Sequence, residues 1–217
     1  MTDQFGMTLE EFQDFEITGP PHAMARLRET IAAQLAPPWS EVPEDRRRKV
    51  GEGMEFLAYD RAGDDLAPDA GVFLMRFGNA FRVTNIVPAK TGSLGIVLYN
   101  RILEDFVDRV AKPVSERLGL TIDLSSPALS MEDSLGDEPA RRLKLFSAAA
   151  NMSSGSSHPL DRARWYDFIL STRDRRIDSG ILGRWLLSLG WDEDSSHRLV
   201  SEFEFGHGLI ARERDPG

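Results

Sequence analysis

The stretch Asn151–Trp165, NMSSGSSHPLDRARW, gathers the residue types that hydrolases use for nucleophilic catalysis. Serine hydroxyls precede a histidine that can take a proton and an aspartate that can orient an imidazole ring. In this hypothesis His158 is the base and Asp161 is the orienting acid. The candidate nucleophiles are Ser153, Ser154, Ser156 and Ser157. A hydrolase with a site near residues 151–164 is therefore one alternative.

The same residues also fit the entrance to a helix. His158 would occupy the N-cap, Pro159 the first helical position and Asp161 the third, where a carboxylate meets the positive end of the helix dipole. Trp165 and Phe168 then follow at helical spacing. A catalytic triad is a spatial pattern, and neighbours in one loop rarely meet in its geometry. We therefore favour helix entry over catalysis.

A third interpretation of this stretch concerns recognition. Asn151, His158, Asp161 and Arg164 would form either a polar network that locks two helices together or an exposed binding patch.

A second candidate for binding is the helical hairpin that contains LLSLGWDEDSSHRLVSEF. Its spacing resembles a helix-turn-helix, but its second helix begins with Asp192, Glu193 and Asp194, which DNA phosphates would repel. These acids could instead form a docking face for a basic protein. Trp185 and Trp191 flank the turn, where they either fill the core or anchor an interface.

Two basic segments keep open a second alternative, a nucleotide or nucleic-acid binder. One is Arg46–Lys49. The other is Lys90, which begins the triplet Lys90–Gly92 without the S-x-x-K and S-D-N partners of β-lactamases or the spacing of a phosphate loop. The plainer interpretation of Lys90–Gly92 is a turn before a helix, with Thr91 or Ser93 as its cap.

Composition excludes several classes of protein. The chain of 217 residues has no cysteine, so disulfides, thiolate metal sites and a cysteine nucleophile are impossible. Its net charge of −9 makes nucleic acid an unfavourable partner and favours a basic protein. The four histidines form no H-E-x-x-H motif, and we predict no metal and no cofactor. Without a signal peptide or an apolar span, a cytoplasmic protein that binds no membrane is expected.

Periodicity predicts a sheet in the first half of the chain. Strands are expected at 54–60, 72–77 and 81–87, paired as an antiparallel meander with a tight turn at Gly78–Asn79. FEITGPP is read as an extended segment, and Thr121–Leu124 as a further short strand. Two faces are predicted for the last meander strand: Phe81, Val83, Asn85 and Val87 on one, Arg82, Thr84 and Ile86 on the other.

Helices are expected around this sheet and throughout the second half. The capping-box pattern of Thr8–Glu11 predicts a short helix, and Pro113 should bend or end the helix that begins near Leu94. The remaining helices are predicted at 22–36, 138–152, 158–174, 179–190 and 192–213, the last weakened at Gly206 and Gly208.

The predicted fold class is α+β. An N-terminal part, residues 1–125, would hold an antiparallel sheet of three to four strands with packed helices. A C-terminal part, residues 126–217, would hold about four helices and pack on the first part as one compact unit.

For function, we expect a non-enzymatic interaction protein. It would resemble a bacterial immunity protein, an antitoxin or an accessory subunit, with an acidic surface that covers a basic partner.

Overall fold

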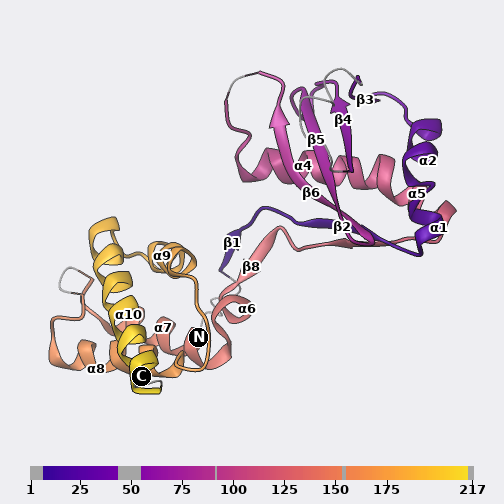
Figure 1. Ribbon diagram of the computed structural model, residues 1–217. Coiled ribbons are helices and arrows are strands. Elements are labelled where there is room, and N and C mark those ends of the chain that lie inside the picture. The colour runs from indigo at the N-terminus through magenta and orange to yellow at the C-terminus, as the bar shows by residue number, and fades with distance from the viewer. Residues whose placement is uncertain (1–6, 44–54, 91, 153–154, 215–217) are drawn as a thin grey trace, which may run out of the picture. The chain divides into compact units, whose positions relative to one another are not determined.

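The structure is a computed structural model that describes residues 7–43, 55–90, 92–152 and 155–214 (Figure 1). The chain forms two compact units. One comprises residues 10–127 and the other residues 128–217 together with the start of the chain up to Leu9. The first unit is built on an antiparallel sheet and the second is largely helical, which confirms the α+β class.

The sheet unit holds six antiparallel strands in the order β3-β4-β5-β6-β2-β7. The predicted meander is confirmed as β4 (Phe56–Arg61), β5 (Ala70–Phe77) and β6 (Ala80–Pro88), and Gly78 adopts the positive φ that its turn requires. The sheet is wider than expected. Beside the meander lie β2 (Phe15–Thr18), within the predicted extended segment, and β7 (Thr121–Leu124), which confirms the predicted short strand. The short β3 (Trp39–Glu41) was not predicted.

A β-bulge in β6 places some side chains of this strand on the opposite face from the one predicted. Phe73 of β5 pairs with Asn85 and Leu74 pairs with Val83, so Thr84 has no partner across the ladder. The extra residue reverses the alternation after it. Ile86 is therefore buried in the core, whereas Asn85 is exposed. The prediction that Asn85 shares the buried face of Phe81 and Val83 is wrong.

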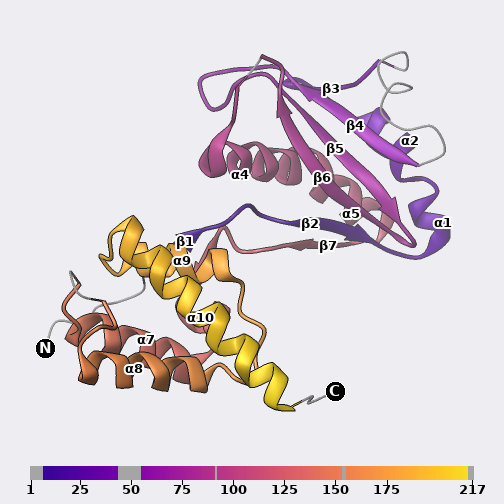
Figure 2. The ribbon, with the colours of Figure 1, turned by 60° about the vertical axis from the view of Figure 1, so that its left-hand side comes forward.

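One long helical run covers a face of this sheet (Figure 2). It comprises α4 (Gly95–Phe106), a π-helical turn η1 (Val107–Ala111) and α5 (Lys112–Leu118). The helix neither stops at Pro113 nor stays regular before it. The wide π turn lies just ahead of the proline, where a proline ring would otherwise clash with a carbonyl one turn back.

The π turn also explains the spacing of the buried residues. They recur four positions apart, and a regular α-helix of 3.6 residues per turn would rotate such a series by about 40° at each step. A wider turn takes up this drift and keeps the series toward the sheet. The two series are Ile102, Phe106, Val110 and Val114, and Leu103, Val107, Ala111 and Ser115.

In its described residues, the first half also contains two smaller helices, and one predicted helix is absent. The segment expected to be helical at 22–36 forms α1 (Pro21–Met24) and α2 (Leu27–Gln34), separated by a short turn. Thr8–Glu11 does not begin a helix. Residues Thr8–Glu10 form strand β1, which pairs with β8 (Ala128–Ser130). A distant strand partner thus overrides the local capping pattern.

The second unit contains the four predicted helices and one more. These are α7 (Asp137–Ala149), α8 (Pro159–Ser171), α9 (Ser179–Ser188) and α10 (Glu193–Arg214), preceded by α6 (Met131–Leu135). Aromatic rings occupy their shared core. Phe146 stacks on Trp191 with centroids 5.2 Å apart, and Trp165 stacks on Phe168 at 5.0 Å.

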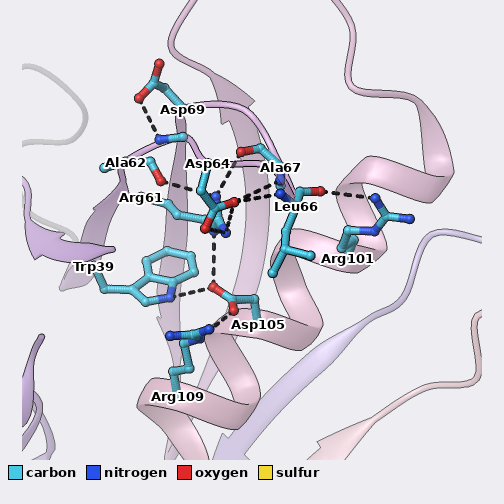
Figure 3. Close-up of polar contacts among 11 residues, drawn as sticks. Trp39, Arg61, Ala62, Asp64, Leu66, Ala67, Asp69, Arg101, Asp105 and Arg109 are labelled. Atoms are coloured by element: carbon cyan, nitrogen blue, oxygen red, sulfur yellow. Dashed lines mark hydrogen bonds and ion pairs between the residues drawn. The ribbon is translucent and has the colours of Figure 1, made fainter. Parts of the chain in front are cut away.

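A buried arginine anchors a loop of the sheet unit (Figure 3). The Arg61 side chain has no exposed surface, yet every one of its nitrogens donates a hydrogen bond. Its Nε donates to Asp105 at 3.1 Å, and its Nη2 donates to both carboxylate oxygens of Asp64 at 2.9 and 2.8 Å. Trp39 Nε1 and Arg109 Nε also donate to Asp105. All the donor groups of Arg61 are thus used to hold the 62–69 loop against α4.

We predict that Asp105→Asn lowers the free energy of unfolding by about 2–4 kcal/mol, because it leaves a buried cation with one balancing charge fewer. Asp108→Asn is the matched control on the same helical run, since Asp108 is exposed and, among the residues that the structure describes, pairs only with Lys112. It should change stability by about 0.5 kcal/mol or less. Urea denaturation followed by circular dichroism measures both. Equal effects would contradict the anchoring role of Arg61.

Candidate interaction groove

His158 and Asp161 lie where a helix entrance requires them. His158 is the exposed N-cap of α8, and its Nδ1 accepts a hydrogen bond from the Leu160 amide at 3.3 Å. Asp161 is buried and accepts from Arg164 Nη1 at 2.8 Å. Asn151 is exposed, and its carbonyl oxygen accepts from the Gly155 amide. Of the predicted recognition residues, the structure therefore pairs Asp161 with Arg164.

The residues of the predicted docking hairpin have structural partners. Trp185 and Trp191 are buried, and their indole nitrogens donate to Ser134 at 2.8 Å and to Ser147 at 2.9 Å. Asp192 caps α10 by accepting from the Ser195 amide at 2.7 Å. That hydrogen bond lowers the pKa of the Asp192 carboxyl. Glu193 is exposed on the first turn of α10, which leaves it available to a partner.

The basic segments contribute little to a site. Lys90 is exposed, whereas Thr91 and the segment Arg46–Lys49 lie outside the described residues. Within the described ranges, Ser93 accepts a long hydrogen bond from Gly95, but the N-cap of α4 is Leu94. Among the residues that the structure describes, no three metal-ligating side chains gather. No helix in the described part is long and apolar enough to cross a membrane.

One hollow of the helical unit lies between α8 and α10. Its volume is about 560 Å³, and one end is formed by the loop before α8. The walls carry large apolar side chains that are at least half exposed: Phe205 70%, Leu209 55%, Leu170 53% and Tyr166 51%. The lining residues are Ser156, Ser157, Arg162, Tyr166, Ile169, Leu170, Glu202, Phe205, Gly206, Leu209 and Ile210. We call this hollow the α8/α10 groove.

The floor of the groove is a close contact between the two helices. A Cβ atom on Gly206 would lie 3.0 Å from Ile169 Cγ2, so a larger residue at this position would require Ile169 to shift. Further along, the Phe168 and Phe203 rings lie 5.9 Å apart, and Thr172 Oγ1 lies 2.6 Å from His207 Nε2.

The proton on this last contact can be assigned. The Thr172 hydroxyl lies 2.7 Å from the Ile169 carbonyl, to which it donates, so it accepts from His207 Nε2–H. Burial, with a smaller contribution from the Arg214 charge, lowers the pKa of His207 and favours its neutral form. The neutral Nε2–H tautomer is sufficient to join α8 to α10.

Polar side chains occupy the end of the groove formed by the loop before α8. At one end the Ser156 hydroxyl lies 2.9 and 2.7 Å from the two Glu202 oxygens. Arg162 makes only long contacts there, at 3.4 Å to the Ser156 and Ser157 carbonyls. Outside the groove, beyond the end of α8, Arg214 Nη2 donates to Asp174 at 2.6 Å, and this hydrogen bond lowers the pKa of Asp174.

This arrangement suits binding better than reaction. A general base must reach the proton it takes, and His158 does not line the groove. The groove does contain two serines, but the partner of Ser156 is Glu202, a carboxylate that fastens the loop to α10. What the groove offers is apolar surface with charged side chains at one end.

Sequence reasoning missed the groove, although α10 carries a signal for it. A helix that packs on one side needs one apolar stripe. The buried Leu199 and Phe203 form that stripe, whereas Phe205 and Leu209 form a second one beside it. A second stripe indicates another surface that excludes water.

Comparisons with known proteins found no relative from which to interpret the fold or the groove. No protein-family model, curated protein or solved structure matches this chain.

We predict that His158→Ala lowers the free energy of unfolding by about 0.5–1 kcal/mol, because α8 loses its cap. His158→Asn, which supplies an amide oxygen in place of the imidazole Nδ1 as the acceptor, should restore most of it. Thermal denaturation measures the difference between the two variants. A loss of the same size in both would contradict the capping role.

The two glycines of α10 should respond differently to alanine. Gly208 has no neighbour within 4 Å of a built Cβ, so Gly208→Ala should stabilise the protein by about 0.5–1 kcal/mol. Gly206→Ala should gain less or lose stability, because Ile169 must move. Urea denaturation of both variants is the measurement. Equal gains would show that the floor of the groove is looser than described.

Proposed function

We propose that this protein is a non-enzymatic interaction module that binds another protein through its helical unit. The observation that carries the proposal is the α8/α10 groove, in which large half-exposed apolar side chains gather. Contiguous apolar patches on proteins mark binding surfaces, because leaving them in water is unfavourable.

The shape of the groove supports a protein as its occupant. Phe205 and Leu209 lie one helical turn apart on α10, and Tyr166 and Leu170 have the same spacing on α8. Two apolar rows of this kind can contact the side chains of an approaching helix, as in helix-in-groove recognition. Charged residues at one end, Arg162 and Glu202, provide a polar rim.

The charge of the chain supports a finer proposal about the partner. The net charge of −9 favours encounter with a basic protein, as expected of an immunity protein, an antitoxin or an accessory subunit. Glu193 and Glu204 are exposed on α10 and would contribute to such an acidic surface.

Affinity capture from the cells that express the protein tests this function. The baits are the full chain, its Leu209→Asp variant and a Leu145→Asp control, which places the same charge at an exposed leucine of α7. We expect a protein that the wild type and the control retain and the Leu209→Asp variant loses. Capture that weakens with added salt would support a basic partner.

Two outcomes would contradict the proposal. One is the same set of captured proteins on all three baits. The other is no specific protein on the wild-type bait.

A further inference from the structure

The charged side chains that line the α8/α10 groove lie at one end, on opposite walls. Among the described lining residues they are Arg162 of α8 and Glu202 of α10. Both contact Ser156 in the loop before α8: Arg162 Nε donates to its carbonyl oxygen at 3.4 Å, and the Glu202 carboxylate lies 2.7 Å from its hydroxyl. The rest of the described lining is uncharged. The groove is therefore polar at one end and apolar along most of its length.

Arg162 and Glu202 can each take a further partner. Within the described residues Arg162 forms no ion pair, and its two hydrogen bonds are long, at 3.4 Å. A guanidinium carries five N–H donors, so most donors of Arg162 have no acceptor in the described part of the chain. Glu202 accepts there from one hydroxyl, which leaves lone pairs on its carboxylate oxygens. Arg164, by contrast, is paired with the buried Asp161 at 2.8 Å.

The charges beyond the end of α8 leave this pattern unchanged. Asp174 accepts hydrogen bonds from both Arg214 and Arg173. None of these three residues lines the groove. The charges of an occupant are therefore met by the groove at the Ser156 end.

The walls of the groove favour a helix as the occupant over an extended segment. Both walls are helices, whose backbone groups are hydrogen-bonded within α8 and α10, and their lining side chains are mostly apolar. An extended segment would bring its backbone N–H and C=O groups against a surface that offers them few partners. A helix satisfies those groups internally, so it can bury an apolar stripe there without that cost.

We propose that the α8/α10 groove binds an amphipathic helix of another protein, which carries an acidic side chain on the flank that faces α8 and a basic one on the flank that faces α10. The proposal rests on the proposed function, because it states the chemistry of the partner segment. The acid pairs with Arg162 and the base with Glu202, both at the Ser156 end. The apolar stripe between them packs on the exposed aromatic and leucine side chains of the two walls. One acidic side chain is a local feature and is compatible with a partner of positive net charge.

Exchange of the two flanks would reverse both charge contacts. A helix of the same composition with its base toward α8 would place like charges together at Arg162 and at Glu202. Like charges at close range oppose association. The apolar contacts would be the same for both helices, so the groove should distinguish them by the position of the charges alone.

Two fluorescent peptides test this selectivity with the full-length chain. Each is held helical by a lactam bridge on its solvent-facing side and has the same apolar stripe, with one glutamate and one lysine near its N-terminal end, on opposite flanks. In the second peptide the glutamate and the lysine are exchanged. Fluorescence anisotropy should show that the wild type binds one peptide at least about tenfold more tightly than the other, because two contacts change from attractive to repulsive.

The decisive variant carries both Arg162→Glu and Glu202→Arg, which exchanges the charges of the two walls and leaves the net charge of the protein unchanged. Its preference between the peptides should be inverted, and tight binding of the other peptide also shows that the variant is folded. The matched control exchanges two exposed charges of α5, Glu116→Arg with Arg117→Glu, and should keep the wild-type preference. Leu209→Asp should lose both peptides, which assigns their binding to the groove.

The remaining outcomes separate this inference from the proposed function. A wild type that binds both peptides equally, or a preference that survives in the double variant, would overturn the charge selectivity. A wild type that binds neither peptide, while its captured partner is still lost in Leu209→Asp, would overturn this helix as the occupant and leave the proposed function in place. A chain that binds neither peptide and captures no protein through the groove would overturn both.

Discussion

The contact of Gly206 with Ile169 is the constraint on which the helical unit depends. It brings the backbone of α10 against a side chain of α8. Tyr166 and Leu170 lie on one wall and Phe205 and Leu209 on the other, with a hollow between them. A side chain at position 206 would require Ile169 to move. A position that lowers helix propensity thus forms the floor of the groove.

The residues that resemble a catalytic set take part in building this surface. His158 starts α8, and Asp161 fixes Arg164 on the first turn. Ser156 joins the preceding loop to Glu202 of α10. Nucleophile, base and acid are common in loops because the same polar groups satisfy free backbone amides and carbonyls. Their presence in one short stretch indicates a helix boundary as readily as an active site.

Local sequence patterns predicted those elements whose local preference agrees with their packing and pairing in the fold. The meander strands, the His158 cap and the four C-terminal helices belong to this group. Thr8–Glu10 was mispredicted because its strand partner lies more than a hundred residues away, and β3 was missed because three residues are too few for a period. The bulge at Thr84 and the groove depend on pairing and packing between elements. The periodicity of one segment carries no information about such contacts. The apolar pair Phe205 and Leu209 was visible in the sequence, but its exposure was not.

The π turn Val107–Ala111 gives the sheet unit an unequal tolerance to changes in length. A π turn is equivalent to one residue added to a regular α-helix. If one residue were deleted there, the π turn could become a regular α-helical turn and the rest of the helix would keep its position. A further inserted residue has no comparable way to be accommodated. Whether Val114 and Ser115 point toward the sheet depends on whether this segment forms a π turn or regular α-helical turns. Length variation in this helix would therefore be expected to favour deletion over insertion.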